Sequence, residues 1–477
     1  SKDKSLARRN VVFKQMEKNG FLTTQEKDSL QQLPLELNYT PESHSDGYAT
    51  YFREHLRDYL KKWVKTHPKP NGETYNIYKD GLKIYTTIDS RMQKYAEEAV
   101  KEHVSNLQSY FNKEQKSNKT APFYDLEPEQ VEMILERAMK NSDRWREFKR
   151  AGVSEKEIRA SFKRKTKMRV FSWKGDRDTI MTPADSIKYY KYFLHSGLFS
   201  MEPQTGHIKA WVGGINNKHF KYDHVEQGKR QVGSTFKPFV YATAINQLGL
   251  SPCDEYPISP YTIPAEKYGM PKPWTPRNSS EDPLRYKGVL SLKEGLAKSV
   301  NTLSARLIDM VGPRNVVRLA KSAGITSKIP EVPSIALGTV EINLYEMVGA
   351  YAMFANKGLR VEPMMIMRIE DKNGTVLEQF TPITKETMSE ESAYVVLDLL
   401  KGVTTAGSGI RLRTTSARPG YVTGYPYGFS NPIAGKTGTT QNHTDGWFMG
   451  VVPNLATGVW TGGEDRATHF AGITKGQ

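Results

Sequence analysis

The sequence predicts an α+β protein with an antiparallel sheet flanked by helices, preceded by a mainly helical linker region. Hairpin patterns and three closing strand patterns surround a run of amphipathic helical segments, and tight turns join antiparallel strands. The chain has 477 residues, which is more than one ordinary hydrophobic core accommodates. We therefore expect about two to four domains.

Composition is that of a globular protein, with 38% hydrophobic and 25% charged residues. The net charge of +16 is compatible with nucleic acid, an anionic membrane surface or an anionic wall polymer as a neighbour. No zinc-finger, RNP-type or helix-turn-helix pattern supports a nucleic-acid partner. The densest basic run, Arg144 to Lys174, has helical spacing and predicts a solvated face. Cys253 is the single cysteine, which excludes an internal disulfide and a thiolate metal cluster.

The region before residue 196 is predicted to be mostly helical. In chain order, the predicted elements are a helix ending near Gly20, a helix starting at Thr24, a helix over residues 48–66, a strand over residues 82–88 and a helix from Asp89 to about His103. Residues 105–182 are polar, rich in lysine and patchily helical, and we interpret them as an inserted helical segment. No run of about 18 apolar residues occurs anywhere in the sequence.

The region after residue 196 contains the strands of the predicted sheet. Residues 197–203 and 207–213 form one hairpin, and the Asn373-Gly374 turn marks a second. The helical segments between and after them cover residues 234–248, 291–298, 301–311, 313–323, 343–356 and 389–402. Strand patterns at residues 432–438, 446–452 and 457–462 close the sequence.

Ser234 and Lys237 form the first of three candidate catalytic groups. A serine at its ordinary pKa is a poor nucleophile and needs a base, and residues at i and i+3 share one helix face. Lys237 can accept the proton only if burial or a second cation lowers its pKa. Gly233, just before the serine, leaves room for a substrate. On its own, the Ser-x-x-Lys pattern more often marks an ordinary helix start.

Two further stretches supply the missing groups. Ser299 offers a hydroxyl to relay a proton, and Asn301 offers an amide to hold a peptide group. In the second stretch, Lys436 is the second cation, and Thr437, Gly438 and Thr439 can bind a carboxylate and a peptide along a strand edge. These residue types suit acyl transfer. No histidine spacing predicts a metal site, and no cofactor is predicted.

The neighbours of the third stretch are less informative. His443 follows the Lys-Thr-Gly strand closely, so it borders the site or lies in an ordinary loop. Trp447 and Phe448 lie on a predicted strand, and we expect both to belong to the core rather than to stack on a substrate.

The order Ser-x-x-Lys, Ser-x-Asn, Lys-Thr-Gly is the set found in penicillin-binding proteins and class A β-lactamases. The sequence resembles most the class A penicillin-binding proteins, which are the bifunctional glycosyltransferase-transpeptidases that build bacterial cell wall. The resemblance covers about Leu198 to Gly476. It rests also on Lys272–Asn278, Val289–Thr302, Ala336–Thr339 and Ala350–Gly358.

The resemblance implies a penicillin-binding transpeptidase or serine β-lactamase-like fold. It also implies three parts: residues 1–40 as the end of a glycosyltransferase domain, residues 41–195 as a linker region with an insertion at about 105–182, and residues 196–477 as the transpeptidase domain. The catalytic part of the glycosyltransferase, the membrane anchor, and a closing strand and helix after Gly476 are expected outside this sequence. The transpeptidase domain is expected on the outer side of the cell membrane.

The resemblance further implies a peptidoglycan D,D-transpeptidase. Ser234 attacks the carbonyl between the two terminal D-alanines of a stem peptide, with Lys237 as base. D-alanine then leaves and receives its proton through Ser299, with Lys436 nearby. An amine of a neighbouring stem then attacks the acyl-enzyme. The partners are the stem peptides of lipid II-derived glycan strands and the cell-wall synthesis machinery.

The same resemblance assigns the remaining site residues. The backbone N–H groups of Ser234 and Thr439 form the oxyanion hole. Asn301 holds the donor peptide, Thr437 and Thr439 hold its terminal carboxylate, and Gly438 lies beside it. A β-lactam antibiotic mimics this donor, acylates Ser234 and stays attached.

Three alternatives remain open. A serine β-lactamase needs a deacylating base, and Val300 stands where the Ser-Asp-Asn motif has an aspartate. A D-alanyl-D-alanine carboxypeptidase uses the same residues with water as the acceptor. A non-catalytic β-lactam sensor or wall-binding scaffold keeps the fold, but the intact set of three motifs argues against it.

Overall fold

The computed structural model describes residues 2–35, 47–279, 285–413 and 428–472, and it divides into two compact units, Ser1–Asp46 and Gly47–Gln477. The first unit contains α1 (Lys2–Lys18) and α2 (Thr24–Gln32). Thr23 caps α2 and exchanges hydrogen bonds with Glu26 in a capping box. The predicted end of one helix near Gly20 and start of the next at Thr24 are confirmed.

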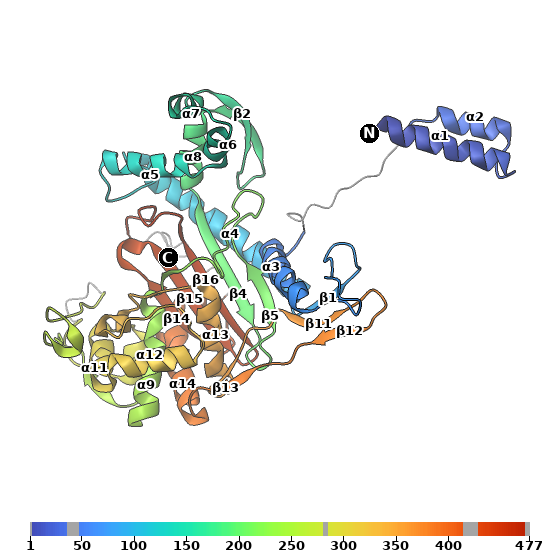
Figure 1. The fold of residues 1–477 in the computed structure, drawn as a ribbon. Helices are drawn as coiled ribbons and strands as arrows, with labels where there is room; N and C mark the ends of the chain where they lie inside the picture. The colour runs from blue at the N-terminus through green and yellow to red at the C-terminus, as the bar shows by residue number, and fades with distance from the viewer. Residues whose placement is uncertain (1, 36–46, 280–284, 414–427, 473–477) are drawn as a thin grey trace. The chain divides into compact units, whose positions relative to one another are not determined.

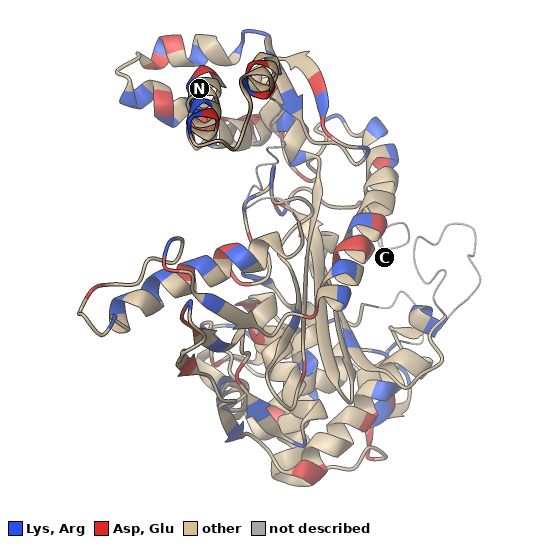
Figure 2. Cartoon of the chain, turned by 90° about the vertical axis from the view of Figure 1, so that its right-hand side faces the viewer, with Lys and Arg blue, Asp and Glu red and all other residues tan. Residues whose placement is uncertain are grey.

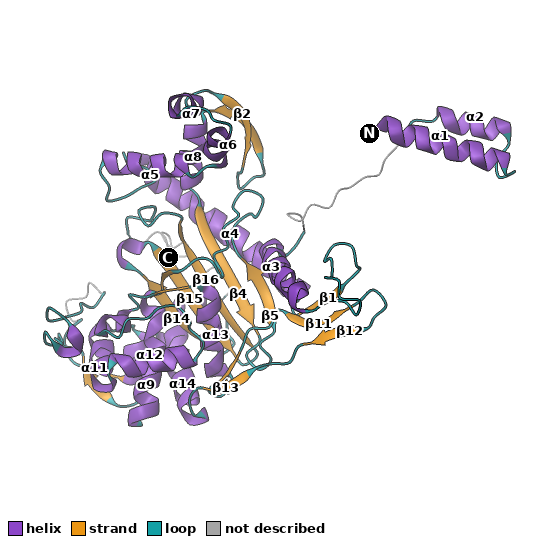
Figure 3. Cartoon of the chain, viewed as in Figure 1, coloured by secondary structure: helices purple, strands orange, loops and turns teal. Residues whose placement is uncertain are grey.

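A five-stranded antiparallel sheet organises the second unit (Figures 1 and 3). Its strands lie in the order β14-β15-β16-β4-β5, so the three closing strands of the sequence pair with the first hairpin. The strands are β14 (Ala434–Thr439), β15 (Asp445–Val452), β16 (Leu455–Gly463), β4 (Leu194–Met201) and β5 (Ile208–Val212). The predicted α+β class with an antiparallel sheet is confirmed.

One face of the sheet packs against the largest helical cluster. Alternate residues such as Trp447, Met449 and Trp460 point into this core, as the two-residue period of a strand requires. The α13 helix covers β4, β15 and β16, and α14 covers β14. The helices of this cluster are α9 (Lys237–Leu248), α10 (Leu292–Ala297), α11 (Asn301–Val311), α12 (Pro313–Ser322), α13 (Leu344–Ala355) and α14 (Glu390–Ala406).

The other face of β4 and β5 is covered by α4 (Ser90–Glu114), with α3 (Thr50–Thr66) also beside β5. Leu107 and Phe111 of α4 pack with Leu194 of β4 in a second core. The prediction that this helix ends at about His103 is wrong, because its apolar face continues for two further turns and is buried by the sheet.

A small module lies between α4 and β4. It has its own core of Trp145, Ile158 and Phe162. Figure 2 shows basic and acidic residues interspersed along the ribbon of the chain. Its elements are α5 (Pro128–Lys140), α6 (Asp143–Arg150), α7 (Glu155–Phe162), α8 (Pro183–Lys191) and a hairpin of β2 (Thr166–Val170) and β3 (Arg177–Met181). The interpretation of this region as a patchily helical insertion misses the hairpin. In β2, exposed Lys167 and Arg169 alternate with Met168 and Val170, a strand period hidden within a basic run.

A second, three-stranded sheet contains β1 (Lys83–Thr86), β11 (Ile366–Glu370) and β12 (Val376–Gln379). It confirms the predicted strand over residues 82–88 and the hairpin around Asn373-Gly374. Three further strand pairs are β6 (Arg230–Gln231) with β9 (Glu341–Ile342), β7 (Glu255–Pro257) with β8 (Val289–Ser291), and β10 (Leu359–Val361) with β13 (Thr384–Glu386). A search of the described helices finds none with the length and apolar character of a membrane span.

Candidate active site

Ser234 and Lys237 stand where β6 leads into the first helix of the core. Ser234 lies in a 3₁₀ turn, η2 (Gly233–Phe236), and α9 begins at Lys237 with Pro238 in its first turn. The backbone N–H of Lys237 donates to the carbonyl of Ser234. The serine is partly exposed, whereas the lysine is fully buried. The candidate nucleophile thus faces solvent while the candidate base is shielded from it.

Ser299 occupies a tight turn between α10 and α11. Its backbone has a φ of 57°, which a residue with a side chain rarely adopts and which is often found at active sites. The turn is closed by the N–H of Val300, which donates to the carbonyl of Gly295. Asn301 then begins α11, and the side chain of Asn278 accepts hydrogen bonds from the first N–H groups of this helix.

Lys436, Thr437, Gly438 and Thr439 lie on β14, an edge strand of the five-stranded sheet. Lys436 is fully buried, whereas Thr437 and Thr439 are partly exposed, in keeping with the alternation of side chains along a strand. In the described part of the chain, β14 pairs with β15 only. An extended peptide can therefore add along its other edge, as in other β-augmentation sites.

The two buried lysines meet at the hydroxyl of Ser299. Lys237 Nζ lies 3.2 Å from Ser299 Oγ, and Lys436 Nζ lies 3.0 Å from the same oxygen. Lys237 Nζ also donates to the Ser299 carbonyl and to Asn301 Oδ1, each at 2.6 Å, and Lys436 Nζ donates to the Thr437 carbonyl at 3.0 Å. Among the described residues, Lys237 is hydrogen-bonded to Ser299 and Asn301 and not to the hydroxyl of Ser234.

This arrangement fits a neutral amine at Lys237. A neutral lysine has two N–H donors and one lone pair, and a charged lysine has three donors. The Ser299 carbonyl and Asn301 Oδ1 only accept, so they use the two donors of a neutral amine. The third neighbour, the Ser299 hydroxyl, can donate to the lone pair. Lys237 is therefore placed to receive a proton.

Burial provides the electrostatic reason for a neutral lysine. The pKa of Lys237 is lowered well below its ordinary value, first by burial and then by the charge of Lys436. Burial also lowers the pKa of Lys436, to about 7. Both lysines thus differ from the exposed lysines of the surface, and a proton can be exchanged near neutral pH.

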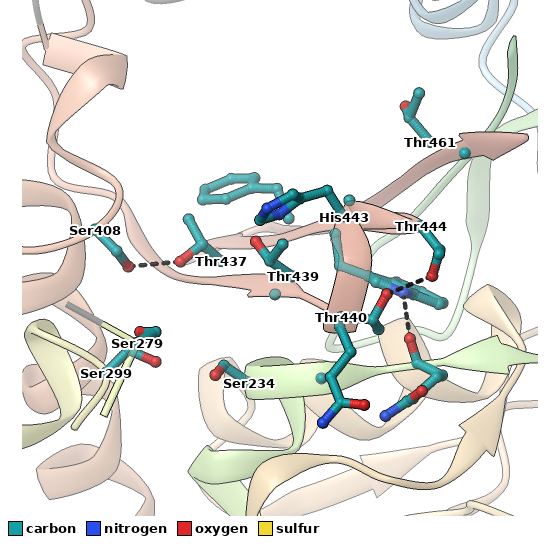
Figure 4. A pocket seen from close by; sticks show the side chains of 18 of the residues that line it. Ser234, Ser279, Ser299, Ser408, Thr437, Thr439, Thr440, His443, Thr444 and Thr461 are labelled. Carbon is teal, nitrogen blue, oxygen red and sulfur yellow. Dashed lines mark hydrogen bonds between the residues drawn. The ribbon is translucent and has the colours of Figure 1, made fainter. Parts of the chain in front are cut away.

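Six of the eight predicted site residues line one cleft of about 1180 Å³: Ser234, Ser299, Asn301, Thr437, Gly438 and Thr439. Figure 4 shows Ser234, Ser299, Thr437 and Thr439 around the same opening. Lys237 and Lys436 are fully buried next to it.

The residues that follow β14 also border this cleft. His443 lines it, which settles the choice between a site residue and a distant loop residue. Burial lowers the pKa of His443. Both Trp447 and Phe448 line the cleft, but Trp447 is buried in the core as predicted, whereas Phe448 is only partly buried. The prediction for Phe448 is wrong because neighbouring residues of a strand point to opposite faces of the sheet.

Two glycines allow η2 and β14 to approach each other. Gly233 has a φ of 53°, and a Cβ atom there would lie 2.7 Å from the carbonyl oxygen of Thr439. A Cβ atom on Gly438 would lie 2.8 Å from the carbonyl oxygen of Val232. Gly233 was predicted to leave room for a substrate, whereas the backbone of Thr439 fills that room.

The sequence analysis missed several residues that support the site. The carboxylate of Asp445 is buried and accepts hydrogen bonds from Arg230, Trp460, Thr440 and Thr444. Ser408 contacts Thr437 from a loop. The ion-pair partner of Asp445, Arg230, and the partner of Ser408, Thr437, are distant in the sequence, so no local pattern predicts either contact. In the described residues, no group of three or more His, Cys, Asp or Glu side chains could hold a metal ion.

Comparison with family models gives two matches. Residues 197–463 match the penicillin binding protein transpeptidase domain, and residues 118–194 match the penicillin-binding protein middle domain. The first match covers more than half of the chain and contains all eight predicted site residues.

Curated relatives match nearly the whole chain. Penicillin-binding protein 1A of Aquifex aeolicus is 28% identical over 474 residues, which cover 96% of this chain and 59% of the relative. Penicillin-binding protein 2D of Bacillus subtilis is 26% identical over 475 residues, which cover 98% of this chain and 52% of the relative. The chain therefore spans between one half and three fifths of the length of these relatives.

Solved structures show the same fold. Penicillin-binding protein 1A from Haemophilus influenzae superposes with a TM-score of 0.64 at 23% identity, over 98% of this chain and 73% of that one. The PonA1 protein from Mycobacterium tuberculosis, in complex with penicillin V, superposes with a TM-score of 0.52 at 20% identity, over 87% of this chain and 83% of that one.

Proposed function

Since the chain belongs to the penicillin-binding proteins, we propose that it is a serine D,D-transpeptidase that cross-links the stem peptides of peptidoglycan. The observation that carries this proposal is the Ser299 hydroxyl, which lies within hydrogen-bonding distance of both Lys237 and Lys436. Such a chain of groups can move a proton away from a nucleophile and return it to a leaving group. The partly exposed Ser234 supplies the nucleophile at the same cleft.

In the proposed acylation, Ser234 Oγ forms a bond to the carbonyl carbon between the two terminal D-alanines. The serine proton passes to Lys237, which is neutral because it is buried next to another lysine. The bond from that carbon to the nitrogen of the last D-alanine then breaks, and this nitrogen receives the proton through Ser299. In the second half, the amine nitrogen of a neighbouring stem peptide forms a bond to the acyl carbon and loses a proton to Lys237. The bond from that carbon to Ser234 Oγ breaks, and Ser234 takes a proton back.

The backbone of the cleft supports the charged intermediate and the donor peptide in this proposal. The N–H groups of Ser234 and Thr439 donate to the oxyanion, and the close approach of η2 to β14 supports their pairing. The donor peptide extends along β14 beside Gly438, with its carboxylate on Thr437 and Thr439. One N–H of Asn301 Nδ2 is used by the carbonyl of Arg277, which leaves the second N–H for the donor.

A β-lactam antibiotic is the proposed inhibitor, because it presents a strained amide and a carboxylate to the same groups. The complex of the related PonA1 protein with penicillin V supports this part of the proposal. No cofactor is required for any step. Because the cell-wall synthesis machinery assembles glycan strands on the outer side of the cell membrane, the proposed substrate implies that the domain lies on that side.

The proposal extends to the arrangement of domains. Residues 196–477 are the transpeptidase domain, residues 41–195 are the linker region and residues 1–40 are the end of a glycosyltransferase domain. The matches to the transpeptidase and middle domain models support the first two assignments.

Two experiments test the function. Incubation with a fluorescent penicillin is expected to label the protein at one site, and Ser234→Ala is expected to abolish the label. Ser279→Ala, which changes another serine of the same cleft, is the matched control and is expected to keep it. Undiminished labelling of Ser234→Ala would exclude Ser234 as the nucleophile.

The second experiment separates the proposal from its hydrolytic alternatives. The intact mass after reaction with benzylpenicillin is followed for several hours. A persistent adduct is expected, whereas rapid loss of the adduct would indicate a β-lactamase. Release of D-alanine from a stem peptide without formation of a cross-linked dimer, in the presence of an acceptor amine, would indicate a carboxypeptidase.

A further inference from the structure

Ser408 is a residue of the cleft to which neither the sequence motifs nor the proposed mechanism assigns a role. It lies on the loop between α14 and η5 (Ile410–Arg413) and lines the cleft together with Ser234 and Thr437. Its Oγ atom lies 2.5 Å from Oγ1 of Thr437, and Figure 4 shows this hydrogen bond at the edge of β14. The contact joins two hydroxyl groups from elements far apart in the sequence.

The loop that carries Ser408 is held tightly in place. The backbone N–H of Ser408 donates to the carbonyl of Ala297 at 3.0 Å, and the N–H of Gly409 donates to the carbonyl of Val403 at 2.9 Å. A Cβ atom on Gly407 would lie only 2.2 Å from the Ala297 oxygen, so the loop and the end of α10 are in close contact. Ala297 precedes Ser299 by two residues. The backbone of Ser408 is therefore held close to the turn that carries Ser299.

A pair of hydroxyl groups has a defined capacity for hydrogen bonds. Each hydroxyl has one proton, and their mutual hydrogen bond uses one of the two. The other proton remains available to an acceptor in the cleft. The hydroxyl that accepts within the pair becomes a better donor, because linked hydrogen bonds polarise one another. An anionic oxygen is the acceptor that gains most from this arrangement.

We propose that Ser408 is a specificity-determining residue that prepares Thr437 to bind the terminal carboxylate of the donor. The Ser408 hydroxyl donates to Thr437 Oγ1, which directs the Thr437 proton toward the carboxylate. This inference rests on the proposed function, because it concerns the donor subsite of the same reaction. It predicts that Ser408 matters for ligands with a carboxylate and not for neutral ligands.

The test compares two acylating probes, benzylpenicillin and its methyl ester, which lacks the anionic carboxylate. The second-order rate constant of acylation is measured for the wild type, Ser408→Ala and Ser408→Thr. Ser408→Ala is expected to lower the rate with benzylpenicillin about tenfold and the rate with the ester less than about twofold, because the Thr437 proton is then no longer directed to the charged carboxylate. Ser408→Thr retains a hydroxyl and is expected to restore most of the rate.

Ser334→Ala serves as the matched control, because Ser334 forms another serine–threonine hydroxyl pair, with Thr339 at 3.2 Å. It is expected to leave both rates unchanged. Equal losses with the two probes in Ser408→Ala would overturn the inference, since a general disturbance of the fold affects both. Unchanged rates with both probes would overturn it as well. Failure of wild-type Ser234 to be acylated by either probe would instead refute the proposed function.

Discussion

Two sets of ion pairs, one in the module of residues 118–194 and one in the transpeptidase region of residues 197–463, lie in opposite surroundings. In the module, Arg159 forms ion pairs with Glu136 and Glu155, and these side chains are 40%, 32% and 60% exposed. In the transpeptidase region, Arg230 and Asp445 form an ion pair with side chains 13% and 0% exposed. Lys237 and Lys436 are fully buried there.

The difference in exposure determines how a charged side chain contributes to stability and to chemistry. Solvent screens an exposed ion pair, so its contribution to stability is small. A buried charge is stable only with good partners, and its protonation state responds to its surroundings. The exposed charges around Arg159 thus serve the surface of the module, whereas the buried charges of Lys237, Lys436 and the Arg230–Asp445 pair can serve chemistry and hold the site together.

The largest expected effect concerns the proposed base. Lys237→Met keeps a long buried side chain but removes the amine, and acylation by benzylpenicillin is expected to fall on the order of a thousandfold. The control is Lys293→Met, which removes a partly exposed lysine of α10 that forms an ion pair with Asp398 of α14. Its acylation rate is expected to match that of the wild type. Loss of less than about tenfold in Lys237→Met would exclude Lys237 as the general base.

The second prediction concerns stability after a buried charge is removed. Asp445→Asn keeps the shape of the side chain but leaves Arg230 without its counter-ion, and we expect a loss of about 3–5 kcal/mol in the free energy of unfolding. Glu136→Gln in the module breaks an exposed pair and is expected to cost less than about 1 kcal/mol. Denaturant unfolding of both variants tests the comparison, and equal losses would contradict it.

The same contrast applies to two glycines with positive φ. Gly233 has a φ of 53° and faces the Thr439 carbonyl, whereas Gly152 of the module has a φ of 77° with open space around it. Gly152→Ala is expected to cost about 1 kcal/mol, which is the backbone term alone. Gly233→Ala is expected to cost roughly 2–3 kcal/mol and to slow acylation, because η2 must move away from β14. Equal losses of stability in Gly233→Ala and Gly152→Ala would show that the close approach of Gly233 to the Thr439 carbonyl contributes little.

The last expected effect is a dependence of stability on pH. The pKa of Lys436 is lowered to about 7, so between about pH 7 and its ordinary pKa the unfolded chain binds a proton that the folded chain does not. Stability therefore rises with pH across this window, by at most about 1.4 kcal/mol per pH unit from this group. The free energy of unfolding of the wild type and of Lys436→Met at pH 7, 8 and 9 measures this contribution. The variant is expected to lack this contribution, and parallel pH profiles would argue against a lowered pKa.

Much of the fold was predictable because strands and helices leave periodic patterns. The alternation in residues 446–452 predicts β15, and Asn373-Gly374 predicts the turn between β11 and β12. The β2–β3 hairpin and the last three turns of α4 were not predicted. In both, the buried face is narrow and the surrounding residues are charged or polar, so the pattern becomes clear only when the packing partner is known.

The sequence by itself determined the chemistry that is available: a serine and a lysine one helical turn apart, a hydroxyl with an amide, and a lysine with two threonines on a strand. It could not determine where these groups meet, since Lys237, Ser299 and Lys436 belong to three different elements. Only the tertiary structure decided that Ser299 lies between the two lysines, that burial lowers their pKa values, and that Ser408 contacts Thr437. The physical reason is that hydrogen bonds and desolvation depend on distance in space, and a local pattern of residues fixes only the distances within its own helix, strand or turn.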